Sequence, residues 1–123
     1  MKFSMKKDEQ DGDKLKNYPA LGEEIFIDFG DSGPFGPFAV KIAVAEEGNR
    51  LTYLVTRGSL LDKTETCEYH AVPVADGVWM VSWREGDGLT VVQVQDFERG
   101  TLESVVTTPE NELFQFGGTL EVL

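Results

Sequence analysis

The regular spacing of turn residues from Gly22 onward constrains the fold of this chain more than any other feature. Glycine, asparagine, aspartate and proline recur in short clusters, and such clusters are typical of tight turns. Between them lie runs rich in Val, Ile, Thr, Phe, Tyr and Trp, which favour strands. We expect about eight strands, near residues 23–29, 38–46, 51–57, 65–75, 78–85, 89–98, 101–108 and 113–122. This pattern predicts an all-β fold, a small antiparallel up-and-down barrel, with a β-sandwich as the alternative.

The last apolar run, Leu113 to Leu123, indicates that the barrel is closed. At a sheet edge this run would expose unpaired backbone groups and favour aggregation. Pairing with the strand near Ile25 removes that edge. The adjacent Gly117 and Gly118 within the run indicate a bend or a close approach of two backbones.

The length of 123 residues suits one domain. We expect a polar N-terminal tail over residues 1–20 and the barrel over residues 21–123. The first residues lack the apolar segment of a secretory signal, and no run of about 18 apolar residues is present to span a membrane. The single cysteine, Cys67, excludes an intramolecular disulfide and suits a reducing compartment. These features predict a cytoplasmic protein with no membrane partner.

The charge balance bears on the partners. The formal net charge is −11, from 11 Lys and Arg against 22 Asp and Glu. An acidic body repels a phosphate backbone, and no basic cluster interleaved with aromatic residues offsets this repulsion. We therefore expect no nucleic-acid partner, and solubility is the simplest explanation of the acidity. A homodimer through an exposed sheet face is compatible with such a barrel, although nothing in the sequence specifies one.

The inner face of the barrel is inferred from the hairpins. Two-residue turns at Asp76-Gly77 and Asp87-Gly88 would bring one set of side chains onto the inner face. That set comprises Glu68, His70, Val72, Trp79, Val81, Trp83, Glu85, Val92, Val94, Asp96, Glu103 and Val105. Alternation in the other strands adds Ile25, Ile27, Phe29, Phe38, Val40, Ile42, Val44, Tyr53, Val55, Phe114 and Phe116. A three-residue loop would reverse every side chain that follows it, so the opposite face, which has fewer acidic residues, is the alternative.

The hairpin from Val78 to Phe97 resembles that of the MoaF-like family. The residues that carry the resemblance are Val81-Ser82-Trp83-Arg84-Glu85, then Gly88, Val91-Val92, Asp96-Phe97 and Gly100. The similarity extends from Cys67 to Thr108. It implies a lipocalin-like (calycin) barrel from a family named for a gene linked with molybdenum-cofactor clusters, whose biochemical role is poorly defined.

The Ser-Trp-x-Glu segment of this hairpin is also similar to one in the phenolic acid decarboxylases, another lipocalin-like family. The glutamate of that family projects into the barrel and takes part in catalysis, a role that the resemblance assigns to Glu85. The two tyrosines of that family's first strand fall here near Ile27 and Phe29, which have no proton to donate. The family's arginine has no clear match. The resemblance therefore implies an inward Glu85 without the groups needed to decarboxylate a phenolic acid.

These observations favour a protein that binds a small apolar or aromatic molecule in the barrel lumen. The candidate ligand-binding residues are Trp83, Trp79, Tyr53, Phe116 and Asp96, and the candidate catalytic or polar-anchoring residues are Glu85 and His70. The alternative is a small enzyme of lyase or isomerase type that uses Glu85 as general acid or base, aided by Tyr53 or His70. Two simpler explanations also stand: Glu85 as a solvated residue at the end of a strand, and a lumen filled by its own side chains.

Metal and nucleophilic chemistry find little support. His70 is the only histidine, whereas metal sites usually combine several His or Cys ligands. Cys67 alternates away from His70, and no serine lies in a recognisable nucleophile elbow. We expect no metal and no cofactor.

The connection 30–38, which carries Phe35 among glycines and prolines, is either a plain surface loop or a lid over the barrel mouth.

Overall fold

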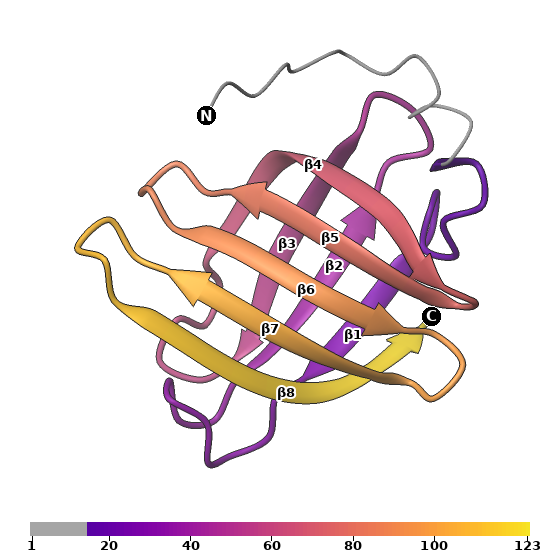
Figure 1. Cartoon of the computed structure of the whole chain (residues 1–123). Helices are drawn as coiled ribbons and strands as arrows, with labels where there is room; N and C mark the ends of the chain where they lie inside the picture. The colour runs from indigo at the N-terminus through magenta and orange to yellow at the C-terminus, as the bar shows by residue number, and fades with distance from the viewer. Residues whose placement is uncertain (1–14) are drawn as a thin grey trace, which may run out of the picture.

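The computed structural model describes residues 15–123. These residues form eight antiparallel strands that follow one another in chain order around a closed barrel (Figure 1). The strands are β1 (Glu24–Asp28), β2 (Ala39–Val44), β3 (Arg50–Arg57), β4 (Thr64–Ala75), β5 (Val78–Arg84), β6 (Thr90–Asp96), β7 (Thr101–Thr107) and β8 (Leu113–Val122). β8 pairs with β1, so each strand has a partner on both sides. The prediction of a closed up-and-down barrel is confirmed, and every expected range overlaps an observed strand.

The last strand closes the barrel at a position where only glycine fits. A Cβ atom at Gly118 would lie 2.6 Å from the carbonyl oxygen of Asp28 in β1. No side chain can be accommodated at that distance from a backbone atom, so any other residue would push the two strands apart. The neighbouring pair in the ladder is Asp28 with Thr119. The close backbone approach expected at this glycine pair is therefore confirmed at Gly118.

The segment before β1 closes one end of the barrel. Leu15, Tyr18 and Ala20 are buried there. The ring of Tyr18 lies 5.3 Å from that of Trp79 and 6.1 Å from that of Tyr69, measured between centroids. Of the expected tail over residues 1–20, residues 1–14 lie outside the described part of the chain. Residues 15–20 belong to the packed barrel, so the core begins before residue 21.

The inner face agrees with expectation in β1, β2, β3, β5 and β8. The first three strands bury aliphatic residues and Tyr53, and β5 buries Val81 and its two tryptophans. Alternation predicts these strands correctly because each has one apolar side and one polar side. The buried members of the expected set are Ile25, Ile27, Val40, Ile42, Val44, Tyr53, Val55, Trp79, Val81, Trp83, Glu85 and Phe116.

Two local irregularities reverse the expected faces of β4, β6 and β7. Val74 is an extra residue in β4, a bulge where the register shifts, so that Tyr69 rather than His70 lies opposite Trp83. Beyond the ends of β5 and β6, Glu85 N–H donates to the carbonyl of Leu89. The loop enclosed by this last pair therefore has three residues, 86–88, instead of two. The strands after this loop therefore turn their other side inward.

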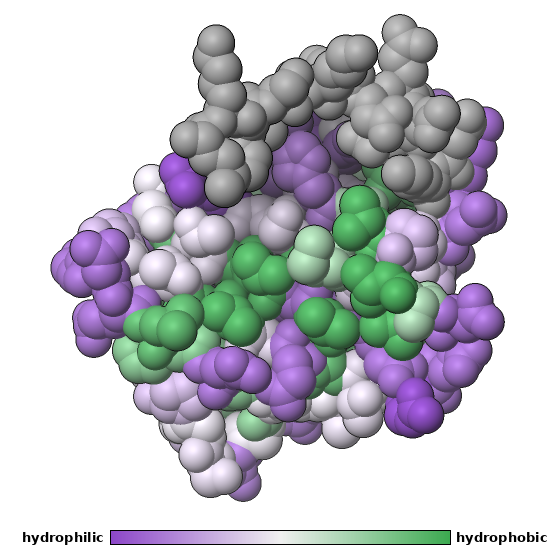
Figure 2. Space-filling view, in the orientation of Figure 1, coloured by the Kyte–Doolittle hydropathy of each residue, from purple (hydrophilic) through white to green (hydrophobic). Residues whose placement is uncertain are grey.

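As a result, valines cover part of the outer surface. The expectation that the following residues face the lumen is wrong: Glu68, His70, Val72, Val92, Val94, Asp96, Glu103 and Val105. The residues that β6 and β7 bury instead are Val91, Gln93, Gln95, Leu102, Ser104 and Val106. Figure 2 shows apolar side chains gathered across the outer face of the barrel, where Met80 and Val94 are exposed.

Candidate functional site

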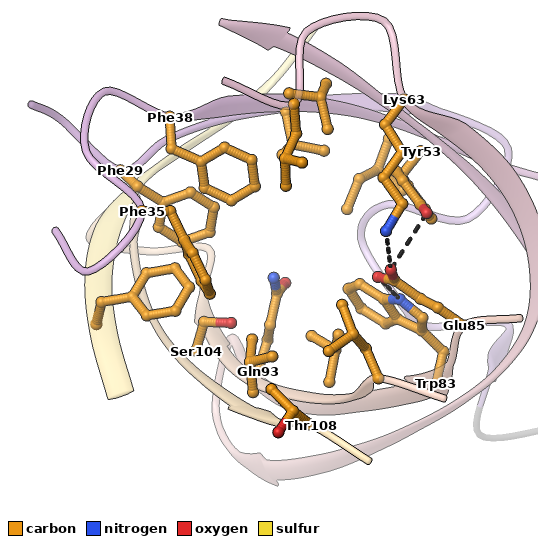
Figure 3. Close-up of a pocket in the computed structure, with 18 residues that line it drawn as sticks. Phe29, Phe35, Phe38, Tyr53, Lys63, Trp83, Glu85, Gln93, Ser104 and Thr108 are labelled. Atoms are coloured by element: carbon orange, nitrogen blue, oxygen red, sulfur yellow. Dashed lines mark hydrogen bonds and ion pairs between the residues drawn. The ribbon is translucent and has the colours of Figure 1, made fainter. Parts of the chain in front are cut away.

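A cavity of about 110 Å³ occupies the lumen at the end away from Tyr18 (Figure 3). The β1–β2, β3–β4, β5–β6 and β7–β8 connections surround this end. The wall is formed by Phe29, Phe35, Phe38, Val40, Ile42, Tyr53, Val55, Leu60, Lys63, Trp83, Glu85, Leu89, Val91, Gln93, Ser104, Val106, Thr108 and Phe116. An engineered apolar cavity of roughly 150 Å³ binds benzene. The space here is of the scale of one small ring.

The carboxylate of Glu85 projects into this cavity. β5 turns Val81 and Trp83 inward, and Glu85 is the next inward position, immediately after the strand, with an exposed fraction of 9%. Lys63 Nζ donates to Glu85 Oε1 at 3.0 Å, and Tyr53 Oη donates to the same oxygen at 3.2 Å. Trp83 Nε1 donates to Oε2 at 3.3 Å. Both oxygens of the Glu85 side chain therefore accept hydrogen bonds from side chains of the cavity wall, which fixes the direction of the carboxylate.

A second carboxylate, Glu65, stands beside Tyr53. The two residues lie opposite each other in the β3–β4 ladder, and Tyr53 Oη is 3.3 Å from Glu65 Oε1. A phenol has one hydrogen, so Tyr53 donates to either Glu65 or Glu85 at a given moment. The other oxygen of Glu65 accepts a hydrogen bond from the N–H of Gly86 at 2.7 Å. Glu65 thereby fixes the β5–β6 loop next to the cavity.

Lys63 balances part of this negative charge. Its ammonium lies 3.0 Å from Glu85 Oε1 and 2.9 Å from Asp87 Oδ2. Burial lowers the pKa of Lys63, but the hydrogen bonds to Asp87 and Glu85 outweigh it and raise the pKa above its ordinary value. The hydrogen bond from Lys63 lowers the pKa of Asp87. Burial, followed by the charge of Glu85, raises the pKa of Tyr53. At neutral pH, Lys63 is therefore a cation, Asp87 an anion and Tyr53 a neutral phenol.

The other side of the cavity is aromatic (Figure 3). Phe29 and Phe38, at the two ends of the β1–β2 connection, stack with their ring centroids 5.2 Å apart. Phe35, within that connection, lies 5.9 Å from Phe38 and 5.4 Å from Phe116 of β8. The connection therefore places the aromatic ring of Phe35 in the cavity wall, and its action as a lid stays a prediction.

Comparison with known proteins places this barrel in a family. The sequence matches the MoaF-like family over residues 32–121, a range that contains β2 to β7 and nearly all of β8. The chain belongs to the MoaF-like family. A crystal structure from Burkholderia vietnamiensis, described as "a putative beta-lactamase", is similar at 27% identity and a TM-score of 0.76, over 85% of this chain and 96% of that one. Among curated proteins no match is found.

This MoaF-like barrel brings four of the expected site residues together. Glu85, Trp83, Tyr53 and Phe116 all line the cavity. Trp79 is buried inside the barrel as expected, but it packs against the N-terminal segment at the closed end. Trp79 thus belongs to the core of the closed end and lies outside the cavity wall.

Two expected site residues, His70 and Asp96, lie outside the lumen. His70 is exposed and pairs with Ser82 on the outer face, because the bulge in β4 reverses its direction. Asp96 accepts hydrogen bonds from the N–H groups of Glu98 and Arg99 and pairs with the Arg99 side chain at 3.0 Å. Asp96 therefore stabilises the β6–β7 turn.

Within residues 15–123, no three His, Cys, Asp or Glu side chains gather in a way that would hold a metal ion.

Sequence reasoning missed five polar residues of the site or next to it, one of them Thr108 in the β7–β8 connection. Lys63 lies in the β3–β4 connection, where no alternation assigns a face, and Glu65 follows it in β4. Gln93 and Ser104 lie on the strands that the three-residue loop reverses. The signal that was available is the segment 86–88, Gly-Asp-Gly, because a glycine at its end is typical of a three-residue hairpin loop.

Proposed function

We propose that this MoaF-like protein binds a small apolar or aromatic molecule in the barrel lumen and that Glu85 holds a polar atom of that molecule. The observation that carries the proposal is a buried, fully oriented carboxylate in the wall of a largely apolar cavity. The barrel is packed at one end, whereas the other end leaves about 110 Å³ unfilled. An apolar cavity with a few oriented polar groups is typical of small-molecule sites.

The cost of burying the carboxylate supports a function for it. A charge inside an apolar lumen destabilises the fold unless partners compensate for its lost hydration. Here three side chains, Lys63, Tyr53 and Trp83, are committed to that compensation. An aliphatic residue in place of Glu85 would pack the lumen without this cost, so packing alone does not account for the arrangement.

The charges around the cavity favour a neutral ligand. Lys63 is the cation of the wall, and its partners Glu85 and Asp87 already exceed its charge. Glu65 adds another acidic side chain next to Tyr53. An anionic ligand would be repelled unless it displaced one of these carboxylates. We therefore expect neutral phenols and terpenoid alcohols to bind more tightly than aromatic acids of the same size.

The experiment that tests this proposal is a ligand screen by thermal shift and tryptophan fluorescence. Its panel contains neutral phenols, terpenoid alcohols and pterins, with aromatic acids as the anionic comparison. We expect a saturable response in the wild type that Glu85→Gln weakens. Glu103→Gln, an exposed change on the outer face of β7, is the matched control and should bind like the wild type. Binding that is equal in both variants, or absent for the whole panel, contradicts the proposal.

A second candidate is a small enzyme of lyase or isomerase type. The contact that favours it is the 3.2 Å hydrogen bond between Tyr53 Oη and Glu85 Oε1, because it places a neutral phenol and a carboxylate on one cavity wall. Turnover of any compound that binds, followed by mass spectrometry, tests it. Loss of turnover with binding retained in Tyr53→Phe supports the enzyme, and binding without turnover in the wild type supports the binding protein.

The description of the Burkholderia protein as a β-lactamase is not extended to this chain. The serine of the cavity wall is Ser104, and the lysine of that wall is Lys63. A lysine acts as a base only when it is neutral, whereas Lys63 is held as a cation by Glu85 and Asp87. Lys63 therefore does not supply the base that a serine–lysine pair needs for acyl transfer from a β-lactam.

The structure bears on the membrane question only. In the part of the chain that the structure describes, no helix is long and apolar enough to cross a membrane. The cytoplasmic location stays a prediction from the cysteine content, and the homodimer stays a prediction from the fold. Gel filtration with light scattering would settle the second point.

A further inference from the structure

A row of buried polar side chains connects the closed end of the barrel with the cavity. Tyr18 Oη donates to Gln95 Oε1 at 2.6 Å. Gln95 Nε2 donates to Gln93 Oε1 at 2.9 Å. Both glutamines are inward residues of β6, with exposed fractions of 3% for Gln93 and 1% for Gln95. Gln93 is the member of this row that lines the cavity.

The tyrosine sets the direction of the whole row. A neutral phenol has one hydrogen to donate, and within residues 15–123 the hydrogen bond found for the Tyr18 hydroxyl is the one to Gln95. Burial, followed by the neighbouring Tyr69, raises the pKa of Tyr18, so the phenol keeps its hydrogen. The phenol oxygen can also accept, but the phenol hydrogen has an acceptor among residues 15–123 only when Gln95 is turned as in the structure, with its oxygen toward Tyr18 and its NH₂ group toward Gln93. Gln93 in turn must accept with its oxygen, which leaves its own NH₂ group for the cavity.

Glu85 presents the opposite polarity in the same cavity. Figure 3 shows the ends of Gln93 and Glu85 reaching into the cavity from separate parts of its wall. An ionised carboxylate only accepts, and its two oxygens offer about four sites. Oε1 accepts from Lys63 and Tyr53, whereas the donor found for Oε2 within residues 15–123 is Trp83. One lone pair of Oε2 is left for a hydrogen-bond donor of the ligand.

We propose that Gln93 determines specificity by acting as a hydrogen-bond donor to the ligand, while Glu85 acts as the acceptor. This inference rests on the proposed binding function and names the class of ligand. The ligand is a small, neutral ring compound with a hydrogen-bond acceptor at the end facing Gln93 and a donor at the end facing Glu85. The ring between them contacts the apolar wall, which includes Val91 and Phe116.

The test compares two probes of the same shape, 4-hydroxybenzonitrile and 4-ethynylphenol. Both have a phenol as donor, but only the nitrile has an acceptor at the other end. By calorimetric titration we expect the wild type to bind the nitrile about fivefold more tightly, the factor typical of one neutral hydrogen bond. Gln93→Leu should abolish this preference and leave 4-ethynylphenol binding nearly unchanged. Gln115→Leu, the same substitution at an exposed position of β8, should keep the preference.

A ratio of the two affinities that is the same in the wild type and in Gln93→Leu overturns the proposal. Because Gln93→Leu also removes the acceptor of Gln95, the fold of each variant is checked by thermal unfolding. A neutron structure of the wild-type protein gives a second measurement that needs no ligand. Deuterium atoms on the Gln93 nitrogen directed into the cavity support the proposal, and a Gln93 oxygen in that place overturns it. If neither probe binds the wild type, the proposed binding function loses support, and the neutron structure still decides the direction of Gln93.

Discussion

Replacing Lys63 with methionine removes the charge of the lysine that lines the cavity and keeps most of its apolar stem. Glu85, which is 9% exposed, would then retain two neutral donors, Tyr53 and Trp83. A hydrogen bond to a charged group contributes roughly 1.5–3 kcal/mol to stability. The Lys63 side chain is 31% exposed, so solvent weakens the interaction. We therefore expect Lys63→Met to lower the free energy of unfolding by about 2 kcal/mol.

The partner substitution should cost less. Glu85→Gln leaves Lys63 with Asp87 at 2.9 Å, and the new amide oxygen still accepts from Tyr53 or Trp83. We expect a loss of about 1 kcal/mol, the size of one net hydrogen bond. In the double variant both charges of the Lys63–Glu85 pair are absent, so no buried carboxylate is left without its cation. Its total loss should therefore be smaller than the sum of the single losses by about 1 kcal/mol, as for other pairs in direct contact.

Urea unfolding followed by tryptophan fluorescence measures all three variants, since Trp83 donates to Glu85. An unchanged slope with urea would show that only stability has changed. Lys41→Met is the matched control: Lys41 pairs with Glu24 at 2.9 Å, but the two side chains are 42% and 50% exposed. We expect it to cost less than about 0.5 kcal/mol. Equal losses for the two lysine variants, or single losses that add up in the double variant, would refute the argument that burial of Glu85 gives this pair its strength.

Four further outcomes follow from individual side chains. Tyr18→Phe removes a buried hydrogen bond and should lower the free energy of unfolding in urea by about 1–3 kcal/mol. Tyr69→Phe changes a buried hydroxyl that has no partner among the described residues, and it should be neutral or stabilising in the same urea assay. The hydrogen bond from Lys63 lowers the pKa of Asp87 and so stabilises the fold when Asp87 is ionised. This contribution is complete at neutral pH and is lost as the pH falls through the lowered pKa. The free energy of unfolding of Lys63→Met should therefore change less on the acid side than that of the wild type. Burial raises the pKa of Cys67 to about 11, so a thiol reagent at neutral pH should react with it only after urea unfolds the barrel.

The strands and their closure could be predicted because turn chemistry is local. Gly77 and Gly88, both at positive φ, lie in the β4–β5 and β5–β6 turns, and glycine adopts that conformation without strain. The close approach at Gly118 was also visible, since a glycine inside a long apolar strand needs a steric reason. These signals identify where strands end, but apart from Gly-Asp-Gly at 86–88 they do not state how many residues each loop and ladder contains.

The direction of side chains was harder to predict because it depends on single residues. One extra residue, Val74, and one loop of three residues instead of two are enough to move His70 and Asp96 from the lumen to the surface. Neither irregularity changes composition or hydropathy, so neither is visible in the pattern of apolar residues. Lys63 is a different case: its role depends on the fold bringing the β3–β4 connection beside Glu85.

β6 shows why the hydrophobic pattern fails near the cavity in particular. This strand turns Gln93 and Gln95 inward and leaves Val92 and Val94 on the outer side. Burying an amide costs free energy unless it is hydrogen-bonded, so a strand that served packing alone would have the opposite arrangement. The row that begins at Tyr18 provides these hydrogen bonds and keeps both glutamines inside. β6, whose inner face contradicts the rule for stability, is therefore the strand that brings an oriented amide to the cavity. This is the arrangement expected if the cavity binds a ligand as proposed, because functional sites are where a sequence departs from the rules of packing.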